Sequence, residues 1–260
     1  MEKPAASVLV DTPSALSALI DSLKGLPREP PSIYIDLEGV NLSRHGTISI
    51  LQLYIHPTNK VYLIDVLILK EKCFSTPATI SPLTLIDILE SKSTPKVFFD
   101  VRNDSDSLYS HFQIKLAGVV DLQLWELAAR PVAGKYVKGL AKCIERDSPL
   151  SDREKAEFMQ TKEKGKMLFS PEHGGSYEVF NERPLSKDIQ AYCAQDVYIL
   201  SSLLRWYTCE CDWIWEKRVA EASQLRVAQS QREDYNGNGG HMTLAPSDWY
   251  YKRQNHASWM

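Results

Sequence analysis

The sequence predicts an α/β fold, in which a mixed β-sheet is flanked by helices. Three strand-like segments follow one another closely, at residues 32–38, 47–55 and 60–66, and connections this short join antiparallel strands. Beyond them, helix-like and strand-like segments alternate, which is typical of an α/β domain with a mixed sheet. No internal repeat is visible in the sequence.

The other elements are predicted from their caps and their hydrophobic periodicity. Pro13 follows Thr12 and Pro82 follows Ser81, an arrangement that favours the first turn of a helix. These remaining elements are, in order, a strand at 7–10, a helix from Thr12 to near Gly25, a helix at 81–91, a strand at 96–100, a helix after Asn103, a strand at 119–123 and a helix at 124–130. From there to about residue 205 the pattern is mainly helical, interrupted by a loop at 169–184.

The composition is that of a soluble globular protein, with 43% hydrophobic and 24% charged residues among 260. No apolar run approaches the 18 residues of a membrane span, and the first residues lack the pattern of a secretory signal, so we expect no membrane association. The five cysteines are odd in number and irregularly spaced, which favours a reduced intracellular compartment, nuclear or cytoplasmic.

Charge alone leaves the question of a nucleic-acid partner open. The net charge is −3, which at first sight argues against such a partner. Between Arg130 and Lys166, however, ten Lys and Arg residues stand against six Asp and Glu residues. This local excess indicates either a solvated helical surface or a surface that faces phosphates.

We expect a folded domain from residue 5 to 220, followed at 221–260 by a helical extension and a flexible tail. A long polar helical pattern comes first, and the tail that follows at 235–260 starts with the Gly- and Asn-rich run YNGNGG. It carries the cluster Trp249-Tyr250-Tyr251, which is expected to be exposed. This cluster could bind a protein partner, a second copy of the chain or single-stranded nucleic acid.

Three acidic clusters stand at the ends of predicted elements. Asp36 and Glu38 alternate with apolar residues, so both carboxylates lie on one face of a strand, where they repel one another unless a counter-charge is present. A second cluster, DVRNDSDSL, covers 100–108. In the third, Tyr192 and Asp196 are four residues apart and share a helix face.

In their order and context these clusters resemble the DEDD exonuclease superfamily, which has a ribonuclease H-like fold. The first motif of that superfamily is a strand with Asp-x-Glu, here Asp36 and Glu38. The third is Tyr-x3-Asp, here Tyr192 and Asp196, which is similar to the DEDDy subgroup. The resemblance covers about residues 8–205 and is nearest to the ribonuclease D and Werner-type domains, in particular their eukaryotic Egalitarian-like branch.

The second motif resembles KVFFDVRNDSDSLYSHFQI followed by VVDLQ. By this resemblance Asp106 is identified as the metal-binding residue, and Asp104 as a first-turn acid favoured by the helix dipole. Because only about 50 residues remain after the core, we expect no helicase-and-RNase-D C-terminal domain, in which respect the chain would depart from ribonuclease D. Residues 150–183 look like an insertion between the second and third motifs, with no assigned function.

The resemblance implies a metal-dependent 3′–5′ exonuclease that acts on single-stranded ends of RNA or DNA. Two Mg²⁺ or Mn²⁺ ions would be held by Asp36, Glu38, Asp106 and Asp196, and Tyr192 would orient the attacking water and partly accept its proton. Hard cations prefer carboxylate oxygen, and a pair of them can stabilise both the attacking and the leaving oxygen. The alternative is a catalytically silent nucleic-acid-binding or scaffold protein with the same fold.

Five basic residues are candidates for contact with the nucleic acid. They are Arg102, His45, Lys162, Lys164 and Lys166. Contacts of this kind would weaken as the salt concentration rises. For each of them, an exposed or structural role without a ligand stays open.

Overall fold

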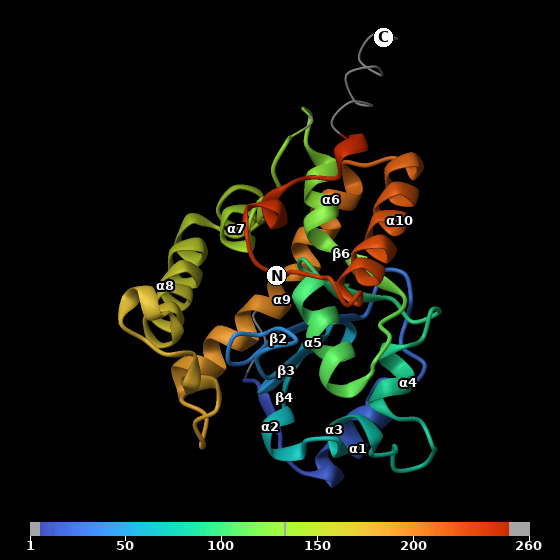
Figure 1. The fold of residues 1–260 in the computed structure, drawn as a ribbon, viewed down its shortest axis with the longest axis vertical. Helices are drawn as coiled ribbons and strands as arrows, with labels where there is room; N and C mark the ends of the chain where they lie inside the picture. The colour runs from blue at the N-terminus through green and yellow to red at the C-terminus, as the bar shows by residue number, and fades with distance from the viewer. Residues whose placement is uncertain (1–5, 133, 250–260) are drawn as a thin grey trace.

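The computed structural model describes residues 6–132 and 134–249. Within these residues the chain forms a six-stranded sheet in the order β1-β4-β3-β2-β5-β6, with helices on both faces (Figure 1). The strands are β1 (Val8–Val10), β2 (Ile33–Glu38), β3 (Ile50–Ile55), β4 (Lys60–Asp65), β5 (Lys96–Phe98) and β6 (Val119–Asp121). The predicted α/β fold with a mixed sheet is confirmed.

Strand β2 lies at the centre of the sheet and carries the first acidic cluster. It pairs with β3 in antiparallel register, which sets Asp36 opposite Gln52 and Glu38 opposite Ile50. On its other side β2 pairs in parallel with β5, and β5 with β6. The chain therefore leaves β2 and β5 at the same end of the sheet, where the segments that follow them meet.

Two hydrophobic cores lie on the two faces of the sheet. One packs α1 and α4 beneath the strands, and the other packs α6 and α9 above them. The helices are α1 (Pro13–Ser22), α2 (Val66–Leu69), α3 (Lys72–Ser75), α4 (Leu85–Leu89), α5 (Arg102–Phe112), α6 (Leu122–Ala129), α7 (Leu140–Asp147), α8 (Asp152–Phe169), α9 (Lys187–Cys209) and α10 (Trp213–Ser230). No helix in the described part of the chain has the length and apolar character needed to cross a bilayer.

The predicted start of the first helix is confirmed, and that of the second is wrong. Thr12 caps α1, because its side chain accepts a hydrogen bond from the Ala15 N–H. The helix predicted from Ser81 begins only at Leu85. Thr84 and Asp87 form a reciprocal capping box there, which satisfies two backbone donors at the start of the helix.

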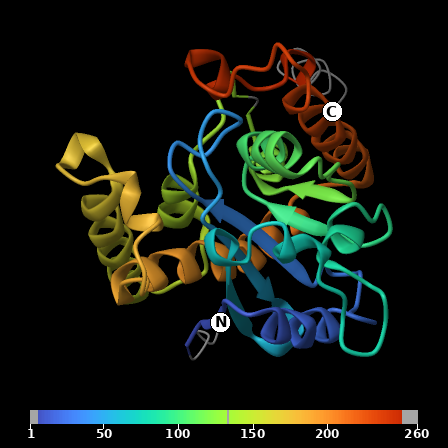
Figure 2. The same cartoon turned by 60° about the horizontal axis from the view of Figure 1, so that its bottom comes forward.

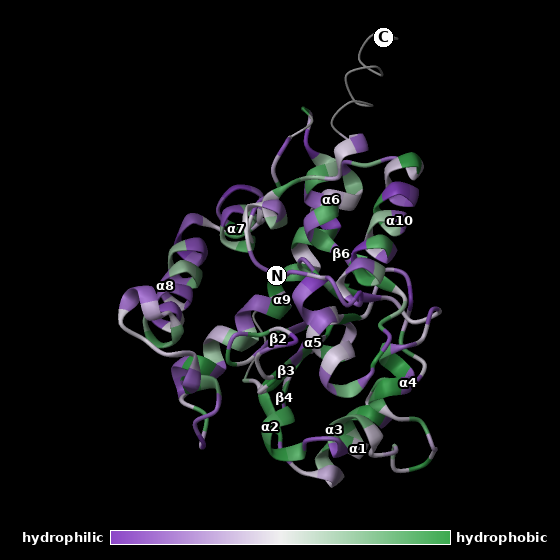
Figure 3. Ribbon diagram, in the orientation of Figure 1, coloured by the Kyte–Doolittle hydropathy of each residue, from purple (hydrophilic) through white to green (hydrophobic). Residues whose placement is uncertain are grey.

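Helices α7 and α8 project to one side of the domain (Figures 1 and 2). Most of α8 is hydrophilic, in contrast to the apolar strands and the helices that cover them (Figure 3). Only Phe158 and Gly165 of α8 are buried. These two residues mark the face of α8 that packs against α9.

The C-terminal region packs on the domain as far as the structure describes it. The expected boundary at residue 220 falls inside α10, which continues to Ser230 and buries Val227 in the core. Trp249, expected to be exposed, is only 4% exposed and meets Trp215 edge to face at 5.2 Å between ring centroids. Tyr250, Tyr251 and residues 252–260 lie outside the described residues.

Candidate active site

Four carboxylates from three elements come together beside the C-terminal end of β2. Asp36 and Glu38 come from β2, Asp104 from the first turn of α5, and Asp196 from the middle of α9. Strand alternation places the first two on one face, and α9 presents Asp196 to that face. Asp104 and Asp196 are 5% and 4% exposed, so little water reaches them to screen their charges.

The electrostatics of these groups show that they act on one another. Burial, and then the charge of Asp196, raises the pKa of Asp36 to about 7. Burial, and then the charges of Asp36 and Asp196, raises the pKa of Glu38 well above its usual value. The pKa of Asp104 is raised by burial and by the charge of Asp36. Such crowding is stable only with protons or cations among the carboxylates.

The structure brings Asp104, and not Asp106, to this group. The two residues are about 200° apart around the helix axis, so they face different neighbours. Asp104 Oδ1 is buried without a hydrogen-bond partner. Asp106 accepts from Arg44 with both oxygens, at 2.7 Å and 2.8 Å. Asp104, in place of Asp106, therefore lies beside the other three carboxylates as a candidate metal ligand.

The nearest cation is the ammonium of Lys162 on α8. Its Nζ donates to Asp196 Oδ2 at 2.5 Å and lies 5.0 Å from the centre of the Tyr192 ring. Although burial alone would lower the pKa of Lys162, the Asp196 carboxylate raises it above its ordinary value. Lys162 therefore stays charged and partly neutralises the carboxylates. It lies among the acids and not on the basic surface where it was expected.

Tyr192 forms the wall of the site next to α8. The ring is 7% exposed and packs against Phe169, with 5.2 Å between ring centroids. A Cβ at Gly165 would lie 2.5 Å from the ring, so only glycine lets α8 approach this closely. Burial, and then the charge of Glu38, raises the pKa of Tyr192 well above its ordinary value. The phenol therefore keeps its proton, and Tyr192 can donate a hydrogen bond to Glu38 or to a bound molecule.

The other candidates for nucleic-acid contact have different surroundings. The Arg102 guanidinium is bound by both oxygens of Asp100, at 2.5 Å and 2.6 Å, so its charge is neutralised within the protein. His45 and Lys164 are exposed, and Lys166 is partly exposed.

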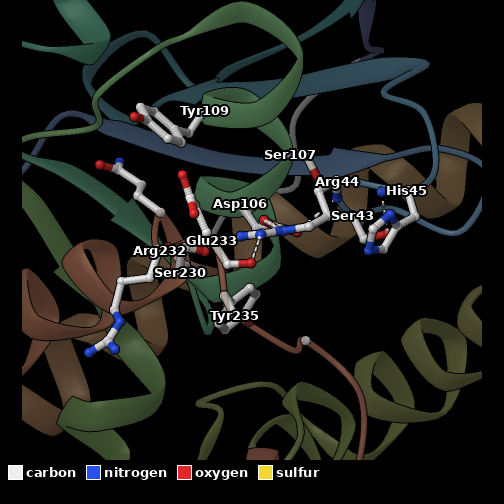
Figure 4. Close-up of polar contacts among 12 residues, drawn as sticks. Ser43, Arg44, His45, Asp106, Ser107, Tyr109, Ser230, Arg232, Glu233 and Tyr235 are labelled. Carbon is white, nitrogen blue, oxygen red and sulfur yellow. Dashed lines mark hydrogen bonds and ion pairs between the residues drawn. The ribbon is translucent and has the colours of Figure 1, made fainter.

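Sequence reasoning missed Arg44, which lies in the loop between β2 and β3. Figure 4 shows its guanidinium between Asp106 and the chain that leaves α10. It donates to the carbonyl oxygens of Ser230, Arg232 and Glu233, at 2.7 to 3.1 Å. The sequence offered one signal, an arginine six residues after Glu38 in a short loop, but its partners are far away in the chain.

The donor set fits a hard divalent cation. It consists of carboxylates and a phenol, and the oxygens Asp104 Oδ1 and Asp196 Oδ1 are buried without partners. In the described ranges, no three His, Cys, Asp or Glu side chains form a ready-made metal cluster as they stand. With the Lys162 ammonium on Asp196 Oδ2, an incoming cation would have to compete for that oxygen.

A family profile described as 3′-5′ exonuclease matches residues 7–205 of the chain. The fold is similar to Trypanosoma brucei RNase D, solved as a complex with GMP (TM-score 0.73, 21% identity, covering 95% of this chain and 71% of that one) and with RNA U12 (0.71, 19%, 95% and 79%). It is also similar to Escherichia coli RNase D (0.60, 20%, 88% and 51%) and to the Aedes aegypti Nibbler EXO domain (0.53, 18%, 83% and 94%). No curated protein sequence matches the chain.

Proposed function

The chain belongs to the 3′–5′ exonuclease family, whose members use divalent metal ions, and from this premise we propose how its site works. The protein removes nucleotides from the 3′ end of a single strand, with two Mg²⁺ or Mn²⁺ ions held by Asp36, Glu38, Asp104 and Asp196. The observation that carries this proposal is the convergence of these four carboxylates beside the buried phenol of Tyr192. Two divalent ions would cancel their four negative charges.

When bound, the metal ions supply an activated water and stabilise the leaving oxygen. The residues of the chain do the rest. Tyr192 keeps its proton and can orient the attacking water through its hydroxyl, while the enclosing walls of α8 and α9 hold the ring in place. Lys162 can offer its ammonium to a non-bridging oxygen of the phosphate once it leaves Asp196.

We propose single-stranded RNA as the first substrate to test. Trypanosoma brucei RNase D has been solved in complex with RNA U12, and that likeness supports RNA over DNA. A matched DNA strand serves as the comparison, because only the 2′-OH distinguishes the two chemically along the backbone.

The test uses 5′- and 3′-labelled single strands with Mg²⁺ or Mn²⁺, beside the variants Asp36→Ala and Asp196→Ala. A ladder that shortens stepwise from the 3′ end and disappears in both variants supports the proposal. Tyr192→Phe is expected to slow cleavage by about 10²-fold, the scale usual for the loss of one hydrogen-bond donor placed at the reacting atoms. Tight binding with no ladder under either metal would refute turnover and leave the nucleic-acid-binding alternative.

A further inference from the structure

The Arg44 side chain joins three segments that are far apart in the sequence. Its Nε donates to Asp106 Oδ1 at 2.7 Å, and its backbone N–H donates to Asp106 Oδ2 at 2.8 Å. Its two terminal nitrogens donate to three carbonyl oxygens at the end of α10 and just beyond (Figure 4). The side chains of Arg44 and Asp106 are 16% and 2% exposed, so this junction is largely shielded from water.

The segment whose carbonyl groups accept from Arg44 also forms hydrogen bonds with α5, to residues on both sides of Asp104. We call residues 230–243 the collar. The Gln231 amide donates to Ser105 Oγ at 3.4 Å, and the Tyr235 hydroxyl donates to Asn103 Oδ1 at 2.9 Å. Arg102 donates to the Met242 carbonyl at 2.7 Å. Collar contacts therefore surround Asp104, while Asp104 Oδ1 itself has no partner within the protein.

We propose that Arg44 and the collar position Asp104 against the carboxylates of β2. Because Asp104 Oδ1 has no hydrogen bond that fixes its direction, the placement of the first turn of α5 decides where the oxygen points. The inference rests on the proposed function, since it concerns how that site is held for a metal ion. Groups that orient metal ligands through such contacts typically change metal affinity or activity about 10- to 100-fold when they are lost.

The loop that carries Arg44 is suited to this task. It starts directly after Glu38, and a Cβ at Gly39 would lie 2.1 Å from the Thr47 carbonyl oxygen. A Cβ at Gly46 would lie equally close to the Asn41 carbonyl oxygen, so the loop is tightly closed on itself. Arg44 thus links β2 to α5 by a short connection, and its position defines the spacing between Glu38 and Asp104.

Arginine is the residue that this junction requires. Its planar guanidinium has five N–H donors in a fixed arrangement, and here they serve one carboxylate and three carbonyl groups. Lysine would keep the positive charge beside Asp106 but has three donors on a single nitrogen. Arg44→Lys therefore keeps the positive charge beside Asp106 but loses most of the hydrogen bonds to the collar.

The test measures magnesium affinity by isothermal titration calorimetry, together with kcat and KM on a single strand, in Arg44→Met, Arg44→Lys and Tyr235→Phe. The matched control is Arg183→Met. Arg183 also binds a buried carboxylate, Asp65, and two carbonyl groups, but Asp65 lies on β4, two strands away from β2. Both methionine variants lose a buried ion pair and are expected to melt at lower temperature.

We expect Arg44→Met to weaken magnesium binding and to lower kcat by about 10- to 100-fold, with a smaller change in KM, and Arg183→Met to keep both values. Arg44→Lys should recover more of the melting temperature than of the magnesium affinity. If Arg44→Met does not fold, the inference is tested by Tyr235→Phe alone. This variant loses only one hydroxyl and should still weaken magnesium binding several-fold.

Equal magnesium affinity in wild type and in the folded Arg44 and Tyr235 variants would overturn the inference. An equal loss in Arg183→Met would do the same, because the effect would then reflect stability alone. If wild type itself neither binds magnesium nor degrades the strand, the proposed function fails and this inference falls with it.

Discussion

Replacing Lys162 with methionine is expected to strengthen magnesium binding. The Lys162 ammonium donates to Asp196 Oδ2 at 2.5 Å, and its charge also acts on Asp36 and Glu38. A divalent ion at Asp196 must compete with this ammonium and is repelled by it. Methionine is unbranched and of similar length, so it can still cover the Tyr192 ring without the charge.

The size of the effect follows from the geometry. Opposite unit charges about 4 Å apart interact by about 4 kcal/mol at an effective dielectric constant of about 20. At about 1.4 kcal/mol for each factor of ten, the upper limit is about 10³-fold in affinity. The Lys162 side chain is 19% exposed, so the displaced ammonium can regain some hydration and the full limit is not reached. We expect a gain of about 10- to 100-fold.

The assay is calorimetric titration of magnesium into wild type, Lys162→Met and the control Lys164→Met. Lys164 lies two residues further along α8 and is exposed, so its loss should leave the affinity unchanged. Without added metal, Lys162→Met should melt below wild type, because the crowded carboxylates lose their nearest positive charge. A dissociation constant that stays the same or rises in Lys162→Met would refute the idea that the ammonium and the metal ion compete.

Four further outcomes are expected. The folded-state pKa of Asp36 is raised to about 7, so a magnesium ion must displace a proton at lower pH. Magnesium affinity should therefore fall by up to about tenfold for each pH unit below 7. A magnesium affinity that stays constant between pH 6 and 8 in calorimetric titrations would contradict this. By the same shift, the stability that protonated Asp36 contributes is complete below about pH 4 and is lost as the pH rises through about 7, which melting curves of wild type and Asp36→Asn can check. Asp104→Asn should abolish the rise in melting temperature that magnesium causes. Asp106→Asn keeps an acceptor for Arg44 and should retain most of that rise. If instead Asp106→Asn abolished the rise and Asp104→Asn retained it, Asp106 would be the ligand. Gly165→Ala should lower the free energy of unfolding by about 1–3 kcal/mol and slow cleavage, because the added Cβ would lie 2.5 Å from the Tyr192 ring. A Gly165→Ala variant with the melting temperature and turnover of wild type would show that α8 can shift to make room.

Local patterns in the sequence predict the mixed sheet and the way the side chains of two of the three acidic motifs point. Alternating residues predict that Asp36 and Glu38 share a face, and the 4, 4, 3, 4 spacing from Ile189 to Leu204 predicts the buried stripe of α9. In both cases a regular period translates directly into a direction in space.

In the second motif, local patterns do not show which acid faces the other carboxylates, because two acids stand two residues apart at the start of a helix. Asp104 and Asp106 point in directions about 200° apart and both are buried, so the choice between them depends on which face of the helix turns toward β2. Leu108, which is fully buried, stands four residues after Asp104 and therefore shares its face. Asp106 stands only two residues before Leu108 and therefore lies on another face of the helix.

The positions of Lys162 and Arg44 could not be predicted from local patterns. Lys162 meets Asp196 across 34 residues of sequence, through a packing of α8 on α9 that depends on a single glycine. Arg44 meets the end of α10 across 186 to 189 residues. Such contacts result from tertiary packing, which no periodicity records.

The collar also has a consequence for the order in which the site can be completed during synthesis. Translation delivers Asp36, Arg44 and Asp104 early, but the acceptors that Arg44 needs in residues 230–233 leave the ribosome much later. At about 5–20 residues per second, Arg44 waits on the order of ten seconds or more for them. If the collar positions Asp104 as proposed, a nascent chain that already contains Asp36, Glu38 and Asp104 lacks the contacts that align these acids until residues 230–233 have emerged.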